Sequence, residues 1–364
     1  MTSPAHPHGP ALAAGPALVV RADRGAVLVV PADDVAAAPR RVALDRDGLV
    51  PQPDGTRVPP TVGDVVDVAV PDVAGPDVTG PDGAGPDGDA PPRVAALHPR
   101  RTALVRDSAD RTSLAQVMAA NVDVVLVVEH LDPDPDLGRV ERLLTLAWRS
   151  GATPVVVLTK ADLVPDPAGM AAEVAAVALG VDVHTVSVPT GDGLDPLRTL
   201  LRPGVALVAV GPSGAGKSTL VNALAGREVM ATAERRADGR GRHTTTHREL
   251  VPLADGAVLV DTPGIRGVGL VADEDALDAT FADVAALAAR CRFRDCAHGS
   301  EPGCAVREAL ATGELAERRY DSWRRLAKEA AWHAQRADAR LAAEERARRR
   351  RATRDYHRDV RTRP

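Results

Sequence analysis

Two nucleotide-binding motifs stand in reverse order along this chain. Residues 211–218 read Gly-Pro-Ser-Gly-Ala-Gly-Lys-Ser, which fits the phosphate-loop pattern G-x-x-x-x-G-K-[ST]. Residues 159–162 read Thr-Lys-Ala-Asp, a form of the N/T-K-x-D element with which GTP-binding proteins read guanine. In most such proteins the phosphate loop comes first, whereas here it follows the guanine reader. The order predicts a nucleotide-binding domain whose sequence is circularly permuted.

The distribution of lysine supports both motifs. Among the 45 lysines and arginines only three are lysine, namely Lys160, Lys217 and Lys328. The first two lie inside the two motifs. A chain that otherwise uses arginine has kept lysine at the two positions where a compact ammonium on a flexible stem is needed in place of a planar guanidinium.

Length and composition bound the remaining possibilities. A chain of 364 residues can form two or three domains. Aromatic residues make up only 2%, so the cores must be aliphatic. We find no run of about 18 apolar residues and no secretory signal, and we expect a cytoplasmic protein without a membrane partner. Residues 1–16 are rich in Pro, Ala and His and predict a disordered tail.

The first domain is predicted to be a small β-barrel over residues 17–106. Short β-like runs at this spacing are typical of a barrel, and five of them suit an OB-fold. A low-complexity insert at 71–92 repeats Pro-Asp every five residues and predicts a solvated loop. The runs span residues 17–21, 26–31, 41–44, 64–70 and 93–97.

A doubly wound α/β domain is predicted over residues 107–285. Its apolar Val/Leu runs are typical of buried parallel strands, with functional loops at their carboxyl ends. Strands are expected at 123–128, 154–158, 181–186, 205–210 and 257–260, and helices at 137–150 and 217–225.

The phosphate loop supplies backbone N–H groups and a helix N-terminus to the phosphates of a nucleotide. Its lysine would bridge the β- and γ-phosphates, and Ser218 would hold Mg²⁺. The expected nucleotide contacts here are Gly211, Pro212, Ser213, Gly214, Ala215, Gly216, Lys217, Ser218 and Thr219.

A D-x-x-G element, Asp261 to Gly264, follows an apolar run. The carboxylate is expected to act on Mg²⁺ through water, and the glycine amide to sense the γ-phosphate. Residues 239–246 are polar and suit a switch loop. Within them Thr245 is our candidate for completing the Mg²⁺ and γ-phosphate contacts.

Guanine selection is assigned to the Thr-Lys-Ala-Asp element. The carboxylate of Asp162 can accept from N1–H and N2–H₂ of guanine, whereas adenine would leave it unpaired at a cost of about 1–3 kcal/mol. The stem of Lys160 would lie over the base. Ala161 stands between Lys160 and Asp162 in the motif, and Thr159 would make a weaker supporting contact. Ser187 fits the small residue whose backbone contacts guanine O6; the alternative is that it only forms a turn.

The residue after D-x-x-G offers no help with catalysis. Ras-like proteins orient the attacking water there with Gln, whereas this chain has Ile265. Slow hydrolysis without a partner is therefore expected. Our candidate catalytic residues are His243, Lys217 and Thr245; the alternative for His243 is a loop histidine without a role.

All three cysteines lie within 14 residues of sequence, which favours metal binding over a disulfide framework. Cys₃His is a tetrahedral zinc set without an open position, so the predicted site is structural. Less favoured ligands are His247, Asp295 and Glu301. The expected zinc ligands are Cys291, Cys296, His298 and Cys304.

The last part of the chain, residues 286–364, is predicted to be a zinc-binding module with an Arg-rich helical tail. It carries a net charge of +8 within a chain whose net charge is −5. Residues 306–354 have helical composition, and nine arginines lie between 346 and 363. This uneven distribution of charge is compatible with contact between the basic end and nucleic acid; a solvated charged helix is the alternative.

Taken together, these motifs resemble those of the ribosome small-subunit-dependent GTPases (the RsgA/YjeQ family). The resemblance implies an OB-fold, a permuted GTPase and a zinc module that assist late 30S maturation. It further implies contact with 16S rRNA, GTPase activity stimulated by the 30S subunit, and a cytoplasmic monomer. It rests on residues 99–106, 159–162, 211–219, 243–246, 261–264, 291–298 and 301–304.

Two other functions stay open from the sequence. A nucleotide-gated RNA-binding protein with negligible turnover is compatible with Ile265. A P-loop ATPase or kinase is disfavoured by Asp162. The Pro-Asp insert and the Arg-rich end depart from the family pattern, and acidic residues near RNA phosphates would be repulsive.

Overall fold

The protein is described from a computed structural model covering residues 15–69, 91–106, 116–230, 248–261 and 273–335. The chain forms two compact units, residues 1–269 and 270–364, which are treated separately below. Most of the predicted tail and insert lie outside the described residues. So do Ile265, the switch segment at 239–246, Gly264 and the arginine cluster at 346–363.

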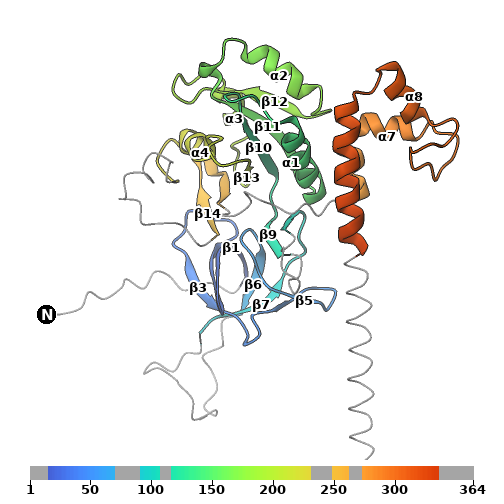
Figure 1. The fold of residues 1–364 in the computed structure, drawn as a ribbon. Helices are drawn as coiled ribbons and strands as arrows, with labels where there is room; N and C mark the ends of the chain where they lie inside the picture. The colour runs from blue at the N-terminus through green and yellow to red at the C-terminus, as the bar shows by residue number, and fades with distance from the viewer. Residues whose placement is uncertain (1–14, 70–90, 107–115, 231–247, 262–272, 336–364) are drawn as a thin grey trace, which may run out of the picture. The chain divides into compact units, whose positions relative to one another are not determined.

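The first unit begins with a closed five-stranded barrel (Figure 1). The strands run in the order β1-β2-β3-β7-β6, and β6 pairs back onto β1. Alternate valines, among them Val19, Val27 and Val66, point inward and are fully buried, so the core is aliphatic as expected. The strands are β1 (Gly15–Asp23), β2 (Ala26–Pro31), β3 (Arg40–Ala43), β6 (Val65–Ala69) and β7 (Arg93–Leu97), with a small hairpin of β4 (Val50–Pro51) and β5 (Arg57–Val58).

A mainly parallel sheet with helices forms the rest of the unit. Its order, β12-β11-β10-β13-β15-β14, puts β13 between β10 and β15, although β13 comes after β10, β11 and β12 in the chain. Only β14 runs antiparallel, at the end of this order. The strands are β10 (Val124–His130), β11 (Thr153–Thr159), β12 (Asp182–Thr185), β13 (Ala206–Val210), β14 (Glu249–Pro252) and β15 (Val258–Asp261).

Helices join these strands and bury their apolar faces against the sheet. Their bounds are α1 (Leu137–Ser150), α2 (Pro167–Ala175), α3 (Leu194–Arg198) and α4 (Lys217–Ala225), with 3₁₀ turns η1 (Ala161–Leu163) and η2 (Ala254–Gly256). Asp136 caps α1 by accepting from the Arg139 backbone N–H, and Gly151 ends it in a left-handed conformation. Buried side chains from α3 and α4 share one core with β10, β11 and β13.

The barrel and the α/β sheet are joined by strand pairing. Arg21 on β1 faces Glu249 on β14, so the two form one continuous eleven-stranded sheet. A hairpin of β8 (Ala103–Arg106) and β9 (Gln116–Ala120) connects them along the chain. The Thr61 hydroxyl of the barrel lies 3.4 Å from the Val117 carbonyl oxygen on β9. None of β8, β9 and β14 was predicted from the sequence.

The second unit is helical. It contains α6 (Glu274–Thr280), α7 (Ala282–Ala288), α8 (Ala305–Thr312) and a helix over 317–335. Arg319 is buried over the Phe281 ring at 4.4 Å and forms an ion pair with Asp283. The helical stretch expected from residue 306 is interrupted, because Gly313 takes φ 79° and ends α8. No helix in the described ranges is long and apolar enough to cross a membrane.

Candidate guanine-nucleotide site and metal centre

The phosphate loop lies between the carboxyl end of β13 and the N-terminus of α4, as its pattern requires. Gly214 and Gly216 take φ 84° and 76°, values that favour glycine. A Cβ on Gly211 would lie 2.1 Å from the Val128 carbonyl oxygen of β10, so a side chain cannot fit there. The glycines therefore shape the loop and let it pass close to the neighbouring strand.

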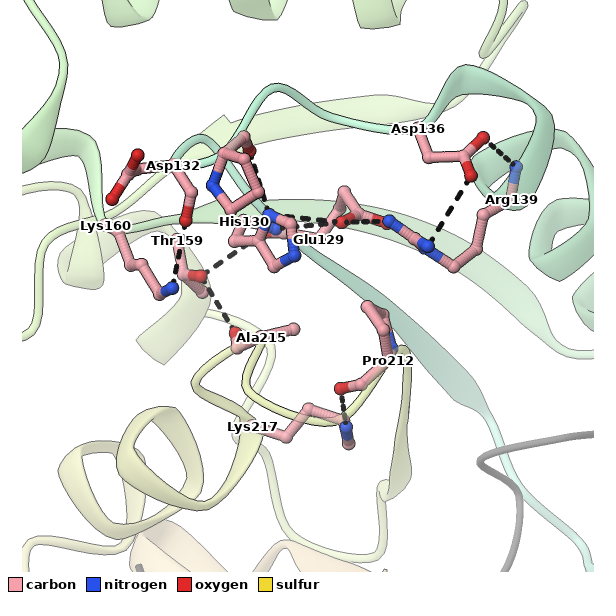
Figure 2. A network of polar contacts seen from close by, with 11 residues as sticks. Glu129, His130, Asp132, Asp136, Arg139, Thr159, Lys160, Pro212, Ala215 and Lys217 are labelled. Carbon is pink, nitrogen blue, oxygen red and sulfur yellow. Dashed lines mark hydrogen bonds and ion pairs between the residues drawn. The ribbon is translucent and has the colours of Figure 1, made fainter. Parts of the chain in front are cut away.

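The N-terminus of α4 has no side-chain cap. Its first-turn N–H groups can therefore serve a bound anion. The Lys217 ammonium donates to the Gly211 carbonyl oxygen at 2.9 Å. It also donates to the Pro212 carbonyl oxygen at 2.5 Å (Figure 2). Ser213, at the tip of the loop, and Thr219, in the first turn of α4, are exposed, and Ser218 is half-buried.

Thr159 ends β11 and joins the guanine reader to the phosphate loop. Its buried hydroxyl lies 2.8 Å from the Ala215 carbonyl oxygen and 3.2 Å from the Glu129 carbonyl oxygen (Figure 2). A single hydroxyl hydrogen serves these two acceptors, with the shorter bond to the phosphate loop. Thr159 thus links the two motifs, and its supporting contact in guanine recognition stays a prediction.

Lys160 and Asp162 follow directly in the chain. Lys160 takes a left-handed conformation, φ 62°, and its ammonium donates to the Asp132 carbonyl oxygen at 3.0 Å. Asp162 lies exposed in η1. The Ala161 N–H donates to the Val186 carbonyl oxygen at 3.2 Å, which ties this turn to the segment after β12.

Ser187 is buried next to this turn. Its N–H donates to the Asp192 carbonyl oxygen at 3.0 Å, and its carbonyl oxygen accepts from the Gly191 N–H at 2.9 Å. These bonds form a turn, in line with the alternative given above. The contact between the Ser187 backbone and guanine O6 stays a prediction.

Asp261 is the last residue of β15, next to the strand that carries the phosphate loop. Parallel strands end at the same edge of a sheet, so Asp261 and the phosphate loop that leads to Ser218 lie at the same edge, on adjacent strands. Hydroxyl and carboxylate oxygens are ligands that Mg²⁺ accepts. The predicted roles of His243, Thr245 and Gly264 fall outside the described residues.

An ion pair with a buried carboxylate beside these motifs was not predicted from the sequence. Glu129, the second-last residue of β10, is fully buried and forms an ion pair with Arg139 in the first turn of α1 (Figure 2). A signal was present, because Glu129 is a carboxylate closing an apolar strand at the edge where the other motifs lie.

In the second unit, the four predicted zinc ligands come together. Their ligand atoms all lie within 4.8 Å of one another. The sulfurs of Cys291 and Cys304 are 3.9 Å apart, and His298 Nδ1 is 3.5 Å from the Cys304 sulfur. Tetrahedral zinc with Zn–S bonds of about 2.3 Å would hold two sulfurs about 3.8 Å apart, so the cluster fits this ion. The set is completed by Cys296.

The loop that carries these ligands is anchored on both sides. The Glu301 carboxylate accepts from the N–H groups of Ala297 and Gly299, so it caps the loop. The Tyr320 hydroxyl donates to the His298 carbonyl oxygen at 3.3 Å, and Trp323 lies against the His298 ring. The Tyr and Trp contacts were not predicted from the sequence.

Comparison with known proteins agrees with this geometry. The family model of the RsgA GTPase matches residues 97–271. The small ribosomal subunit biogenesis GTPase RsgA of Streptomyces avermitilis is 54% identical over 250 residues, or 68% of this chain and 67% of the relative. Its namesake from Streptomyces coelicolor is 46% identical over 333 residues, which cover 90% and 84% of the two chains.

Two solved structures share the fold. YjeQ from Thermotoga maritima superposes with a TM-score of 0.60 at 24% identity, covering 86% of this chain and 98% of that one. YloQ, described as a circularly permuted GTPase, gives 0.57 at 22% identity, covering 88% and 96%. The predicted barrel and permuted GTPase domain are confirmed. The motifs, their arrangement and the relatives lead to one conclusion: the chain belongs to the RsgA GTPase family.

Proposed function

We propose that this GTPase binds the small ribosomal subunit and assists late 30S maturation, hydrolysing GTP to GDP and phosphate with stimulation by the subunit. The observation that carries the proposal is the bond between the Thr159 hydroxyl and the Ala215 carbonyl, which holds the guanine reader against the phosphate loop. The partner is inferred from the relatives, which are named small ribosomal subunit biogenesis GTPases.

In this proposal, residues at the sheet edge have separate roles in binding the base, the phosphates and Mg²⁺. Asp162 pairs with guanine, and Lys160 lies over the base. Lys217 leaves the loop carbonyls to which it donates and neutralises the β- and γ-phosphates. Mg²⁺, bound with GTP by Ser218 and Thr245, would withdraw charge from the phosphates.

His243 is our candidate for orienting the attacking water, because Ile265 cannot. Its segment, 231–247, leads directly into Arg248 and β14, and β14 pairs with β1 of the barrel. The Arg248 guanidinium also approaches the Val117 carbonyl oxygen of β9, at 3.4 Å. The residues that follow the switch segment are therefore tied to the barrel by strand pairing and to the β8–β9 hairpin by the Arg248 side chain.

We assign the barrel and the Arg-rich end to contact with 16S rRNA, and we expect a cytoplasmic monomer. The zinc ion has a structural role, because four protein ligands leave no open position. It would hold the ligand loop at Cys291 and Cys304 against the helix at 317–335.

Turnover of GTP and ATP, each measured alone and with purified 30S or 50S subunits, tests the proposal. We expect slow GTP hydrolysis that only the 30S subunit accelerates. A rate that 30S leaves unchanged while binding persists would favour the second candidate, a nucleotide-gated rRNA-binding protein, to which Ile265 points. Preference for ATP would contradict the role of Asp162.

A further inference from the structure

Glu129 is a fully buried carboxylate at the carboxyl end of β10. Burying a charged group costs free energy unless it is paired and hydrogen-bonded. No catalytic or nucleotide-binding role assigned above uses this side chain. The hydrogen-bond partners of the Glu129 carboxylate indicate a structural role for it.

Both oxygens of Glu129 bind the guanidinium of Arg139. Arg139 Nε lies 2.7 Å from Oε2 and its second nitrogen 3.0 Å from Oε1. The His130 N–H also approaches Oε1, at 3.3 Å. This two-pronged pair joins the end of β10 to the first turn of α1 and so fixes both ends of the loop at residues 131–136.

That loop contacts the guanine reader through main-chain atoms. The Leu131 N–H donates to the Thr159 carbonyl oxygen at 3.0 Å. The Asp132 carbonyl oxygen accepts from the Lys160 ammonium at 3.0 Å, and the Glu129 carbonyl oxygen lies 3.2 Å from the Thr159 hydroxyl (Figure 2). Three contacts thus link the segment held by the ion pair to Thr159 and Lys160.

We propose that Glu129 is a positioning residue for guanine-nucleotide binding: its ion pair with Arg139 holds the end of β10 and the loop that follows, and main-chain groups of this segment orient Thr159 and Lys160. The inference rests on the proposed nucleotide role of Lys160 and Asp162. The four-carbon stem of Lys160 is flexible, so anchoring its ammonium restricts it before the base arrives. Restricting a binding group in advance increases affinity by lowering the entropy cost of binding.

Within the described ranges, the residues assigned to chemistry lie on or after strands other than β10 and β11. Lys217 and Ser218 follow β13, and Asp261 ends β15. Weakening the Glu129 pair should therefore change nucleotide affinity and KM, and leave kcat at saturating GTP unchanged. This split separates positioning from catalysis.

The barrel offers a matched control. Asp64 is also fully buried, and Arg100 binds it in the same two-pronged way, at 2.8 and 2.9 Å. Substituting Asp64 by Asn removes a buried charge from the same unit, at a pair built from barrel residues. Its effect measures what general loss of stability does to binding.

We would titrate wild type, Glu129→Gln, Asp64→Asn and Arg139→Lys with fluorescently labelled GDP and record their melting curves. Glu129→Gln should fold, because the Arg139 side chain is one-third exposed and can be hydrated. We expect it to bind GDP about three- to tenfold more weakly. Arg139→Lys keeps the charge but loses the two-pronged geometry, so it should weaken binding in the same direction. Asp64→Asn should bind like wild type despite an equal or larger loss in melting temperature, because Arg100 is more buried than Arg139.

Wild-type affinity in Glu129→Gln, or an equal loss in Asp64→Asn, would overturn the positioning role and leave the proposed function intact. Failure of the wild-type protein to bind GDP would instead refute the proposed function, and the positioning role with it. A fall in kcat at saturating GTP without a change in KM would also contradict the proposal.

Discussion

The Thr159 hydroxyl lies 2.8 Å from the Ala215 carbonyl oxygen, so residues 56 positions apart in the chain meet where the T-K-x-D motif contacts the phosphate loop. The bond joins the last residue of β11 to the loop after β13, across β10, which lies between these strands. In the proposed function, this bond sets the spacing between the motif assigned to guanine and the loop assigned to the phosphates. The same hydroxyl lies 3.2 Å from the Glu129 carbonyl oxygen, so Thr159 contacts both the end of β10 and the phosphate loop.

Replacing Thr159 by Val should weaken GDP binding about three- to tenfold, because the isosteric side chain leaves the Ala215 carbonyl without its partner. Titration with labelled GDP measures the loss. Thr145→Val is the matched control, since its buried hydroxyl donates to the Glu141 carbonyl within α1. Equal GDP affinity in the two variants would contradict a coupling role for Thr159.

Replacing Lys217 by Met should lower 30S-stimulated turnover by about 10² or more, because the charge forming on the phosphates loses its cation. The methylene stem is kept, so packing changes little. Lys328→Met removes the third lysine of the chain, an exposed one, and should leave turnover unchanged. Comparable rates in the two variants would exclude Lys217 from transition-state stabilisation.

Replacing Asp162 by Asn should exchange guanine for xanthine specificity. Xanthine carries a carbonyl where guanine carries its N2 amino group, and an amide can donate where a carboxylate only accepts. Displacing labelled nucleotide from the protein with GDP or with XDP gives the ratio of the two affinities. We expect the preference to reverse from GDP in the wild type to XDP in the variant. An unchanged preference for GDP would assign base selection to another residue.

The parts of the fold that were predicted come from strong local patterns. The strand before the phosphate loop is an unbroken Val/Ala/Leu run, and the glycines of the loop allow backbone conformations that other residues disfavour. The zinc ligands were equally readable, because the only three cysteines of the chain lie close together in the sequence.

The parts that were missed depend on long-range pairing. Strand β14 is four residues long, ends in Pro252 and gains its partners from β15 and β1. Hydrophobic periodicity does not predict the Glu129–Arg139 pair, because the pair forms only when the end of β10 meets the start of α1 in the fold. The break at Gly313 was different, since a glycine inside a helical pattern is itself a C-cap signal.

Removing the zinc ligand Cys304 as Cys304→Ser should release the metal and unfold the ligand loop, since a serine hydroxyl is a poor zinc ligand. Metal analysis of the purified protein and its melting curve report both effects. Glu301→Gln is the control: its carboxylate accepts from two loop N–H groups, so the variant should keep one zinc per chain with a lower melting temperature. Loss of zinc from Glu301→Gln alone would make Glu301 a ligand.

Replacing His243 by Ala tests the catalytic group directly. Ile265 offers no hydrogen bond to water, so a group from the switch segment or from the subunit must orient the nucleophile. If His243 does so, the variant should lose about 10²–10⁴ of the 30S-stimulated kcat with its GTP affinity unchanged. His247→Ala, four residues later in the same segment, controls for disturbance of the loop. A stimulated rate equal to that of the wild type would remove His243 from the mechanism and transfer the role to the ribosomal partner.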